Sequence, residues 1–184
     1  GSLPPVVLTL PSGVQIRFRG RIDRVDSLAG DSKVVVIDYK SGVTSYYQDM
    51  KDDPLAGGRH LQLPVYALAA RAGTDGEPDA DVEACYWFVT ARGGFERRTV
   101  PLAQVEDRFR EVAEGITSGI QQGLFPTNPG PPGREGRPRN CQICDFDRIC
   151  PANREALWAR KRGNPEVAPY LNLSAAADAG EAEE

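Results

Sequence analysis

The stretch Lys33-Val34-Val35-Val36-Ile37-Asp38-Tyr39-Lys40 is the strongest indication of fold in this chain. Four consecutive β-branched residues follow a Gly-Asp-Ser turn, which predicts a strand that is buried along most of its length. The strand ends abruptly in Asp38, Tyr39 and Lys40, so it brings charged groups to the rim of a core. Because side chains alternate along a strand, Asp38 and Lys40 are expected on the same face.

Upstream of this strand, residues 5–10 and 14–19 are rich in β-forming residues and flank Pro11-Ser12-Gly13, which predicts a β-hairpin. The second strand is expected to run on through Asp23. If it neighbours the 33–40 strand, Asp23 and Asp38 converge at one place on the sheet.

Two converging carboxylates suit a hard divalent cation such as Mg²⁺, and a lysine beside them can orient or help deprotonate an attacking water. The alternative is two unrelated ion pairs. In that reading Asp23 pairs with a neighbouring arginine and Asp38 with Lys40, each contributing at most about 1 kcal/mol.

Downstream, apolar residues at helical spacing predict a helix over residues 60–70, in which Pro64 is tolerated if it falls in the first turn. Residues 83–90 and 95–100 are expected to be strands around a 91–94 turn. An apolar stripe predicts a longer helix from residue 102 to about 120 that stops at Gly123. The single histidine, His60, is expected at the surface or at a helix start.

Gln62 and Tyr66 lie four residues apart on the first of these helices and so share one face. An amide and a phenol placed in this way can contact a substrate or orient neighbouring groups. The alternative is a half-buried packing tyrosine and a solvated glutamine.

Three of the four cysteines form a C-x₂-C-x₅-C run, Cys141, Cys144 and Cys150. This spacing favours a thiolate-held metal or cluster, for which zinc and iron–sulfur both fit. Cys85 lies in the middle of the 83–90 strand and is expected to be an ordinary core residue. The surrounding segment carries eight basic against four acidic residues, which predicts either a basic lobe that tracks a phosphate backbone or a solvated charge mixture.

Composition limits the classes of protein that fit. The chain has 184 residues, 40% hydrophobic and 26% charged, and no apolar run approaches the roughly 20 residues of a membrane span. No signal peptide opens it, so a cytoplasmic protein with no membrane partner is expected. The Gly1-Ser2 start resembles the scar of a cleaved tag, and we expect a natural segment upstream.

The charge of the chain is concentrated in its tail. The net charge of −4 comes from an acidic, Ala-rich C-terminus, since the remaining 22 acids balance 22 bases. Any affinity for nucleic acid must therefore be local. We expect a core over residues 3–124, a Pro/Arg-rich loop and cysteine segment over 125–170, and a disordered acidic tail over 171–184.

Three motifs together resemble the RecB-type branch of the PD-(D/E)xK nuclease superfamily. They are Gly20-x-x-Asp23-Arg24-Val25-Asp26, Ile37-Asp38-Tyr39-Lys40-Ser41-Gly42 and Leu61-Gln62-Leu63-Pro64-x-Tyr66-Ala67-Leu68, in that order and at that spacing. The resemblance implies an α/β, restriction-endonuclease-like core with a central mixed β-sheet flanked by helices, followed by a C-terminal cysteine-cluster segment.

The resemblance also implies roles for individual residues. Asp23 and Asp38 would bind Mg²⁺ or Mn²⁺ with the Tyr39 carbonyl as a further ligand, and Lys40 would help activate water. The Gln-x-x-x-Tyr signature of the family maps onto Gln62 and Tyr66. A catalytic set of Asp23, Asp38, Lys40, Gln62 and Tyr66 is therefore expected.

A subset of RecB-like nucleases, including AddB-type and CRISPR-associated exonucleases, holds a 4Fe-4S cluster by one cysteine before the core and three after it. Cys141, Cys144 and Cys150 match the latter three, and the fourth cysteine is expected upstream of residue 1. The resemblance implies a metal-dependent DNA exonuclease or endonuclease domain in DNA repair, recombination or a helicase–nuclease system, with a helicase region or subunit as partner. The alternative is a catalytically inactive DNA-binding or scaffold domain of the same fold.

Overall fold

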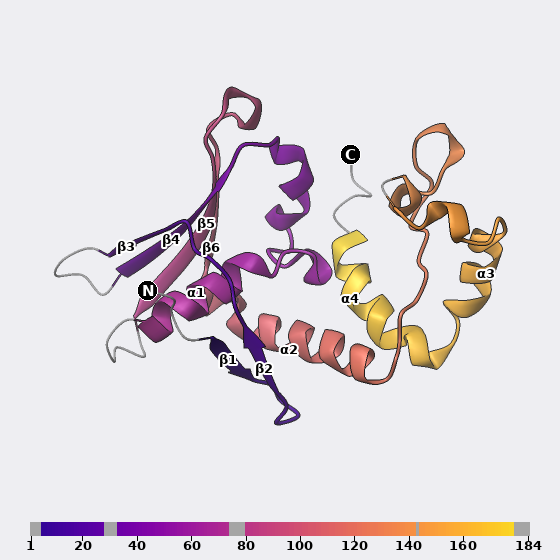
Figure 1. Ribbon diagram of the computed structural model, residues 1–184, viewed down its shortest axis with the longest axis horizontal. Helices are drawn as coiled ribbons and strands as arrows, with labels where there is room; N and C mark the ends of the chain where they lie inside the picture. The colour runs from indigo at the N-terminus through magenta and orange to yellow at the C-terminus, as the bar shows by residue number, and fades with distance from the viewer. Residues whose placement is uncertain (1–4, 28–32, 74–79, 143, 179–184) are drawn as a thin grey trace. The chain divides into compact units, whose positions relative to one another are not determined.

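The computed structural model describes residues 5–27, 33–73, 80–142 and 144–178 (Figure 1). The chain divides into two compact units. One comprises Gly1–Glu114 together with the chain from Leu173 onward, and the other comprises Gly115–Asn172. Both β-sheets and every residue predicted to be catalytic belong to the first unit, so the candidate site is described within it.

Strands β1 (Val6–Thr9) and β2 (Gln15–Phe18) form the predicted hairpin. They pair antiparallel, with Val6 opposite Phe18. The turn between them contains Gly13 at φ +85°, a conformation that glycine adopts without steric cost. The hairpin is a separate two-stranded sheet.

The prediction that the second strand runs on to Asp23 is wrong. Strand β2 ends at Phe18, and Asp23 stands just before β3 (Arg24–Ser27), which belongs to the other sheet. The hairpin ladder stops at the pair of Val6 with Phe18, and no strand is assigned to residues 19–22. The chain therefore leaves one sheet and enters the other between residues 19 and 23.

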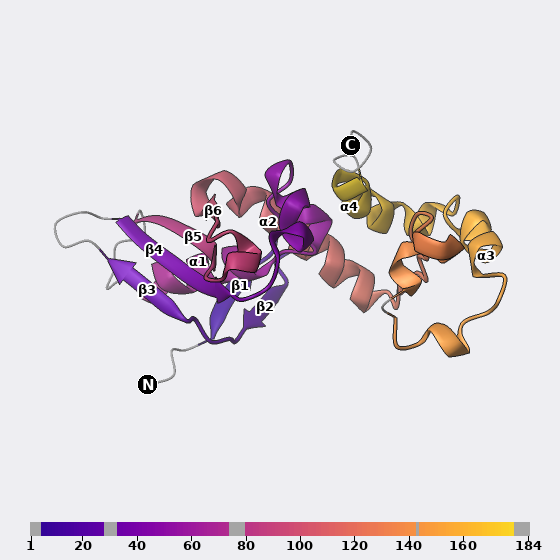
Figure 2. The ribbon, with the colours of Figure 1, turned by 90° about the horizontal axis from the view of Figure 1, so that it is seen from above.

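The central sheet has the strand order β3-β4-β5-β6, where β4 is Lys33–Lys40, β5 is Asp81–Phe88 and β6 is Arg97–Pro101. Strand β4 runs antiparallel to β3 and parallel to β5, and β6 runs antiparallel to β5. Strands β3 and β4 lie side by side in both views (Figure 1; Figure 2). The expected mixed sheet is confirmed, although the Gly30-Asp31-Ser32 turn expected before β4 lies outside the described residues.

Helix α1 (Gln62–Gly73) packs against β4 and β5. It buries Leu63, Ala67 and Leu68, and the sheet buries Val36 and Phe88. Pro64 falls in the first turn of the helix, where its missing N–H has no intrahelical acceptor. The start of α1 is thereby packed onto the strand that ends in Asp38 and Lys40.

Helix α2 (Leu102–Gln121) buries the predicted apolar stripe from Leu102 to Val112, whereas Ile120 at its end is exposed. The ring of Phe109 lies 6.1 Å from that of Phe18. The helix is followed by Gly123 at φ +69°, as predicted. Arg71 of α1 donates two hydrogen bonds, of 2.7 and 2.8 Å, to the Glu106 carboxylate of α2. These hydrogen bonds, with a further one from Arg110, hold the pKa of Glu106 below its usual value despite partial burial.

The second unit contains the Pro/Arg-rich segment and α3 (Arg154–Lys161). The rings of Trp158 and Tyr170 meet edge to face at 6.2 Å, and the Tyr170 hydroxyl accepts a hydrogen bond from Asn128 at 3.2 Å. Trp158 therefore packs against another aromatic side chain of the same unit.

Helix α4 (Ala168–Asp178) corrects the expected disorder of residues 171–184. Residues 171–178 are helical because the segment is rich in alanine and leucine, which have the highest helix propensities. Residues 179–184 lie outside the described residues. Among the described helices, none combines the length and the apolar character required to cross a bilayer.

Candidate active site

The end of β4 carries the central acidic group of the site. The Asp38 residue is 5% exposed, on the face of the sheet covered by α1, and Lys40 lies two residues further along the same face. Ionised carboxylates are seldom this buried without a partner. The Lys40 Nζ lies 2.5 Å from Asp38 Oδ2 and provides that partner.

Helix α1 completes a closed set of polar contacts around this pair. The Gln62 amide nitrogen donates to Asp38 Oδ1 and to the Tyr66 hydroxyl, both at 3.0 Å. Lys40 Nζ donates to Gln62 Oε1 at 3.1 Å. Gln62 and Tyr66 are adjacent here because residues four apart share a helix face. The structure thus brings Asp38, Lys40, Gln62 and Tyr66 into one cluster.

Asp23 lies beside this cluster but is held differently. Its Oδ2 accepts a hydrogen bond from the backbone N–H of Tyr39 at 3.0 Å. This contact places the Asp23 carboxylate next to the backbone of the residue that follows Asp38. The side chain of Asp23 itself is exposed.

The Lys40 ammonium also lies over the ring of Tyr86, 4.6 Å from its centroid. An aromatic face attracts a cation, so this contact helps to hold the lysine at the rim of the core. Burial raises the pKa of the Tyr86 hydroxyl well above its usual value, and the nearby hydroxyl of Tyr47 and the Asp38 carboxylate raise it further. Tyr86 therefore remains a neutral phenol at physiological pH.

The oxygen atoms present fit a hard divalent cation. Apart from its ion pair with Lys40, Asp38 Oδ2 is buried and accepts no hydrogen bond within the described part of the chain. Over those same residues, no group of three or more His, Cys, Asp and Glu side chains lies close enough to hold a metal ion. A pair of carboxylates nonetheless suits Mg²⁺, which in phosphate-processing sites is bound by one or two carboxylates plus substrate phosphate and water. The Tyr39 carbonyl stays a prediction as a further ligand.

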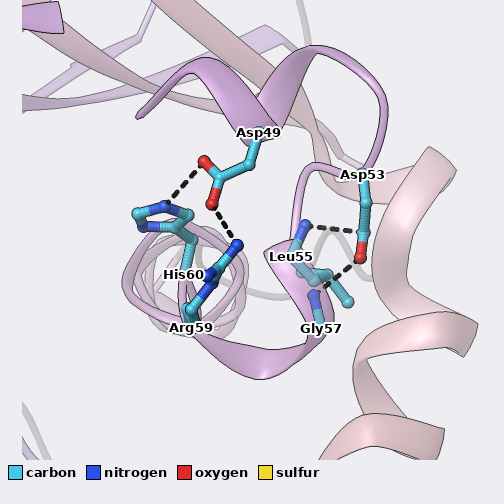
Figure 3. A network of polar contacts seen from close by, with 6 residues as sticks. All are labelled: Asp49, Asp53, Leu55, Gly57, Arg59 and His60. Atoms are coloured by element: carbon cyan, nitrogen blue, oxygen red, sulfur yellow. Dashed lines mark hydrogen bonds and ion pairs between the residues drawn. The ribbon is translucent and has the colours of Figure 1, made fainter. Parts of the chain in front are cut away.

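The approach to α1 is fixed by a polar network that the sequence did not reveal (Figure 3). Asp49 accepts hydrogen bonds from Arg59 at 2.7 Å and from His60 Nε2 at 3.2 Å. The His60 ring also stacks on Tyr47 at 5.1 Å. His60 thus stands at the start of the helix, as expected, and helps to set where α1 begins.

The same loop is closed a few residues earlier by Asp53, whose carboxylate accepts hydrogen bonds from the backbone N–H groups of Leu55 and Gly57 at 3.0 and 2.7 Å (Figure 3). A polar stretch between a strand and a helix predicts only a loop, so neither aspartate could be selected in advance. Both act by positioning the chain that leads to Gln62.

The cysteines are placed differently from the acidic cluster. Cys85 is 3% exposed in β5, which confirms its expected place in the core, and burial raises the pKa of its thiol. Cys141 is buried, Cys144 is exposed and Cys150 is partly exposed. In the described portion of the chain these three do not come together as a metal-binding group, so the cluster stays a prediction.

An ion-pair network lies within the cysteine segment. Asp147 accepts from both Arg137, at 2.7 Å, and Arg154. The hydrogen bond to Asp147 is the largest cause of a raised Arg154 pKa, and a hydrogen bond to Cys141 adds to it. These contacts take up two of the arginines that the sequence suggested for phosphate binding.

Comparison with known proteins yields one family and a set of relatives. The family model described as the PD-(D/E)XK nuclease superfamily matches residues 3–151. No solved structure matches the chain.

The relatives are bacterial proteins that are each named as one of the subunits of an ATP-dependent helicase/deoxyribonuclease. The one from Clostridium botulinum strain Langeland is 40% identical over 88 residues, 44% of this chain and 7% of the relative. The one from Symbiobacterium thermophilum is 47% identical over 79 residues, 41% of this chain and 6% of the relative. The match therefore covers only a small part of the length of these proteins.

Proposed function

The chain belongs to the PD-(D/E)XK nuclease superfamily, and we propose that it is a divalent-metal-dependent deoxyribonuclease domain that hydrolyses phosphodiester bonds in DNA. The observation that supports this best is the buried Asp38 carboxylate, bound by Lys40 and Gln62 with Asp23 alongside. The names of the relatives, which combine a helicase with a deoxyribonuclease, support DNA as substrate and a helicase region or subunit as partner.

The metal would be Mg²⁺ or Mn²⁺, held by Asp23 and Asp38. The buried Asp38 Oδ2, which accepts no hydrogen bond within the described residues, supports this assignment. When bound, the ion would stabilise negative charge on the phosphodiester under attack. We retain the Tyr39 carbonyl as a proposed further ligand.

The residues of the chain itself would position the nucleophile and the substrate. Lys40 carries three N–H donors, of which the ion pair with Asp38 and the bond to Gln62 use two. Its remaining donor is available to orient an attacking water or a phosphate oxygen. Gln62 holds the Asp38 and Lys40 side chains in position by one hydrogen bond to each. Tyr66 fixes the orientation of the Gln62 amide.

For the cysteine segment we propose a 4Fe-4S cluster, with zinc as the alternative. Cys141, Cys144 and Cys150 supply three thiolates at chelating spacing, which suits either metal. In its support, Cys141 is buried and forms a hydrogen bond with Arg154. Metal analysis after anaerobic iron and sulfide reconstitution, on the parent and on Cys144→Ser with Cys85→Ser as control, distinguishes iron from zinc.

The proposed nuclease is tested by cleavage of end-labelled linear single- and double-stranded DNA in Mg²⁺ and in Mn²⁺. Asp38→Asn and Lys40→Met each remove one charge from the cluster. Cleavage should fall at least 100-fold in both, because the Asp38 carboxylate would hold the metal and the Lys40 charge would act on the attacking water or the phosphate. Asp26→Asn is the matched control, since this partly exposed aspartate on β3 is bound to Arg24 and to nothing in the site.

The proposal is supported if the parent and Asp26→Asn both cleave DNA while Asp38→Asn and Lys40→Met do not. If the folded parent binds DNA but cuts neither substrate with either metal, the alternative of an inactive DNA-binding scaffold replaces it. Equal cleavage by the parent and Asp38→Asn would also contradict the assignment.

A further inference from the structure

Three exposed arginines stand in a line that leads to the candidate site. Arg17 lies in β2, and Arg19 and Arg21 follow at alternate positions in the segment that leads to Asp23; all three are exposed. We refer to these three as the arginine row. Side chains two residues apart on extended chain point to the same side.

The residues between these arginines face the core, and they determine which side of the segment is exposed. Ile16, Phe18 and Ile22 are half-buried, and Phe18 packs against a helix of the core. Gly20 occupies the remaining inward position, where an added Cβ would lie 3.2 Å from the ring of Tyr66. Three half-buried side chains, together with a Gly20 position that faces Tyr66, therefore leave the arginine row on the exposed side, although the ladder of β2 ends at Phe18.

The arginine row is also free of countercharge. Among the described residues, none of its three guanidinium groups forms an ion pair or a side-chain hydrogen bond. Arg24, the next arginine along the chain, is instead bound to Asp26 at 2.7 Å. Most other arginines of the first unit are similarly neutralised by a carboxylate. Unpaired, solvated arginines on one line are suited to an external anion.

We propose that the arginine row binds the phosphate backbone of the DNA strand that enters the site, with successive phosphates on successive arginines. This inference rests on the proposed function. Extended chain rises about 3.3 Å per residue, so alternate positions in extended chain are about 6.6 Å apart. Neighbouring phosphates along a polynucleotide strand have a similar separation. The guanidinium fork binds phosphate oxygens in a bidentate manner, and the row ends at a carboxylate of the proposed metal site.

The test measures DNA binding separately from cleavage. All variants carry Asp38→Asn and are assayed without divalent metal, so that no strand is cut. Fluorescence anisotropy gives the affinity for a labelled single strand and for a labelled duplex across a series of salt concentrations. The variant Arg17→Gln/Arg19→Gln/Arg21→Gln is compared with the unsubstituted row and with Arg108→Gln, an exposed arginine on α2.

Each lost phosphate contact lowers the slope of log K against log salt by about 0.7 for a single strand. The triple variant should therefore lose about 2 from the slope, or on the order of 100-fold in affinity at 0.1 M salt. A lower affinity and a smaller salt slope of the triple variant, on the single strand, the duplex or both, support the proposal and identify which form of DNA the arginine row binds. Unchanged slopes on both, or a parent that binds neither, would overturn it. A parent that binds through the row yet cuts nothing in Mg²⁺ would instead count against the proposed nuclease alone.

Discussion

The contact between Asp38 and Lys40 predicts a measurable coupling between them in the folded protein. Asp38→Asn removes the partner of Lys40, and Lys40→Met leaves the Asp38 carboxylate without its countercharge. Because Asp38 and Lys40 side chains are only 8% and 22% exposed, the pair lies between a surface ion pair, worth at most about 1 kcal/mol, and a buried one, whose breaking costs roughly 3–5 kcal/mol. We expect each single variant to lose about 2 kcal/mol of unfolding free energy.

The double variant should lose about 2 kcal/mol less than the sum of the two single losses, because the second substitution has no pair left to break. Urea unfolding in EDTA measures this coupling free of metal. The chain has two tryptophans, Trp87 in β5 and Trp158 in the second unit, so a Trp158→Phe background restricts the fluorescence to the unit that holds the site.

The control double-mutant cycle combines Lys40→Met with Asp26→Asn. Asp26 is paired with Arg24 and does not contact Lys40. Residues that do not interact should be additive within about 0.5 kcal/mol. If the Asp38 and Lys40 cycle is also additive within that limit, the two side chains are not in contact and the geometry of the site is refuted.

Three further predictions follow from individual contacts. Gly20→Ala should lower cleavage roughly tenfold, since the new Cβ displaces Tyr66 by a few tenths of an ångström, whereas Gly42→Ala, with no atom within 4 Å, should not. Glu106→Gln should lose about 1–2 kcal/mol in urea unfolding at pH 7. Because the folded pKa of Glu106 is lowered, that deficit is fully present above the ordinary Glu pKa and disappears as the pH falls through the folded value; a deficit independent of pH would contradict it. Cys85 should react with a thiol reagent only at the rate of unfolding, and prompt labelling of a Cys85-only variant would contradict its burial.

Much of the site could be predicted because its residues lie on regular elements. The β-branched run before Asp38 predicted a buried strand, and alternation alone placed Lys40 on the same face. Helical periodicity placed Gln62 and Tyr66 on one face of α1. Their contacts with Asp38 required the packing of α1 on β4, which periodicity indicates only as a buried face.

The parts that could not be predicted depend on where regular structure stops. The alternation of residues predicted that the second strand continues to Asp23, because residues 19–22 show no clear turn motif. Where the ladder ends depends on the pairing of β2 with β1, whose last pair is Val6 with Phe18, and this register cannot be read from the sequence of β2. The same limit applies to Asp49, whose partners Arg59 and His60 are brought to it by the path of a loop.

The position of Asp23 at the edge of the ladder also explains how it can serve the site. Strands β3 and β4 pair from Arg24 opposite Ile37, and the next residues along β4 have no β3 partner. The N–H of Tyr39 would face the side of β3 unpaired, and it donates to the Asp23 carboxylate instead. One oxygen of Asp23 thus replaces a backbone acceptor and fixes the side chain, and the other would be the oxygen that the proposed metal binds. The sheet therefore ends where the site begins, and the same hydrogen bond accounts for both.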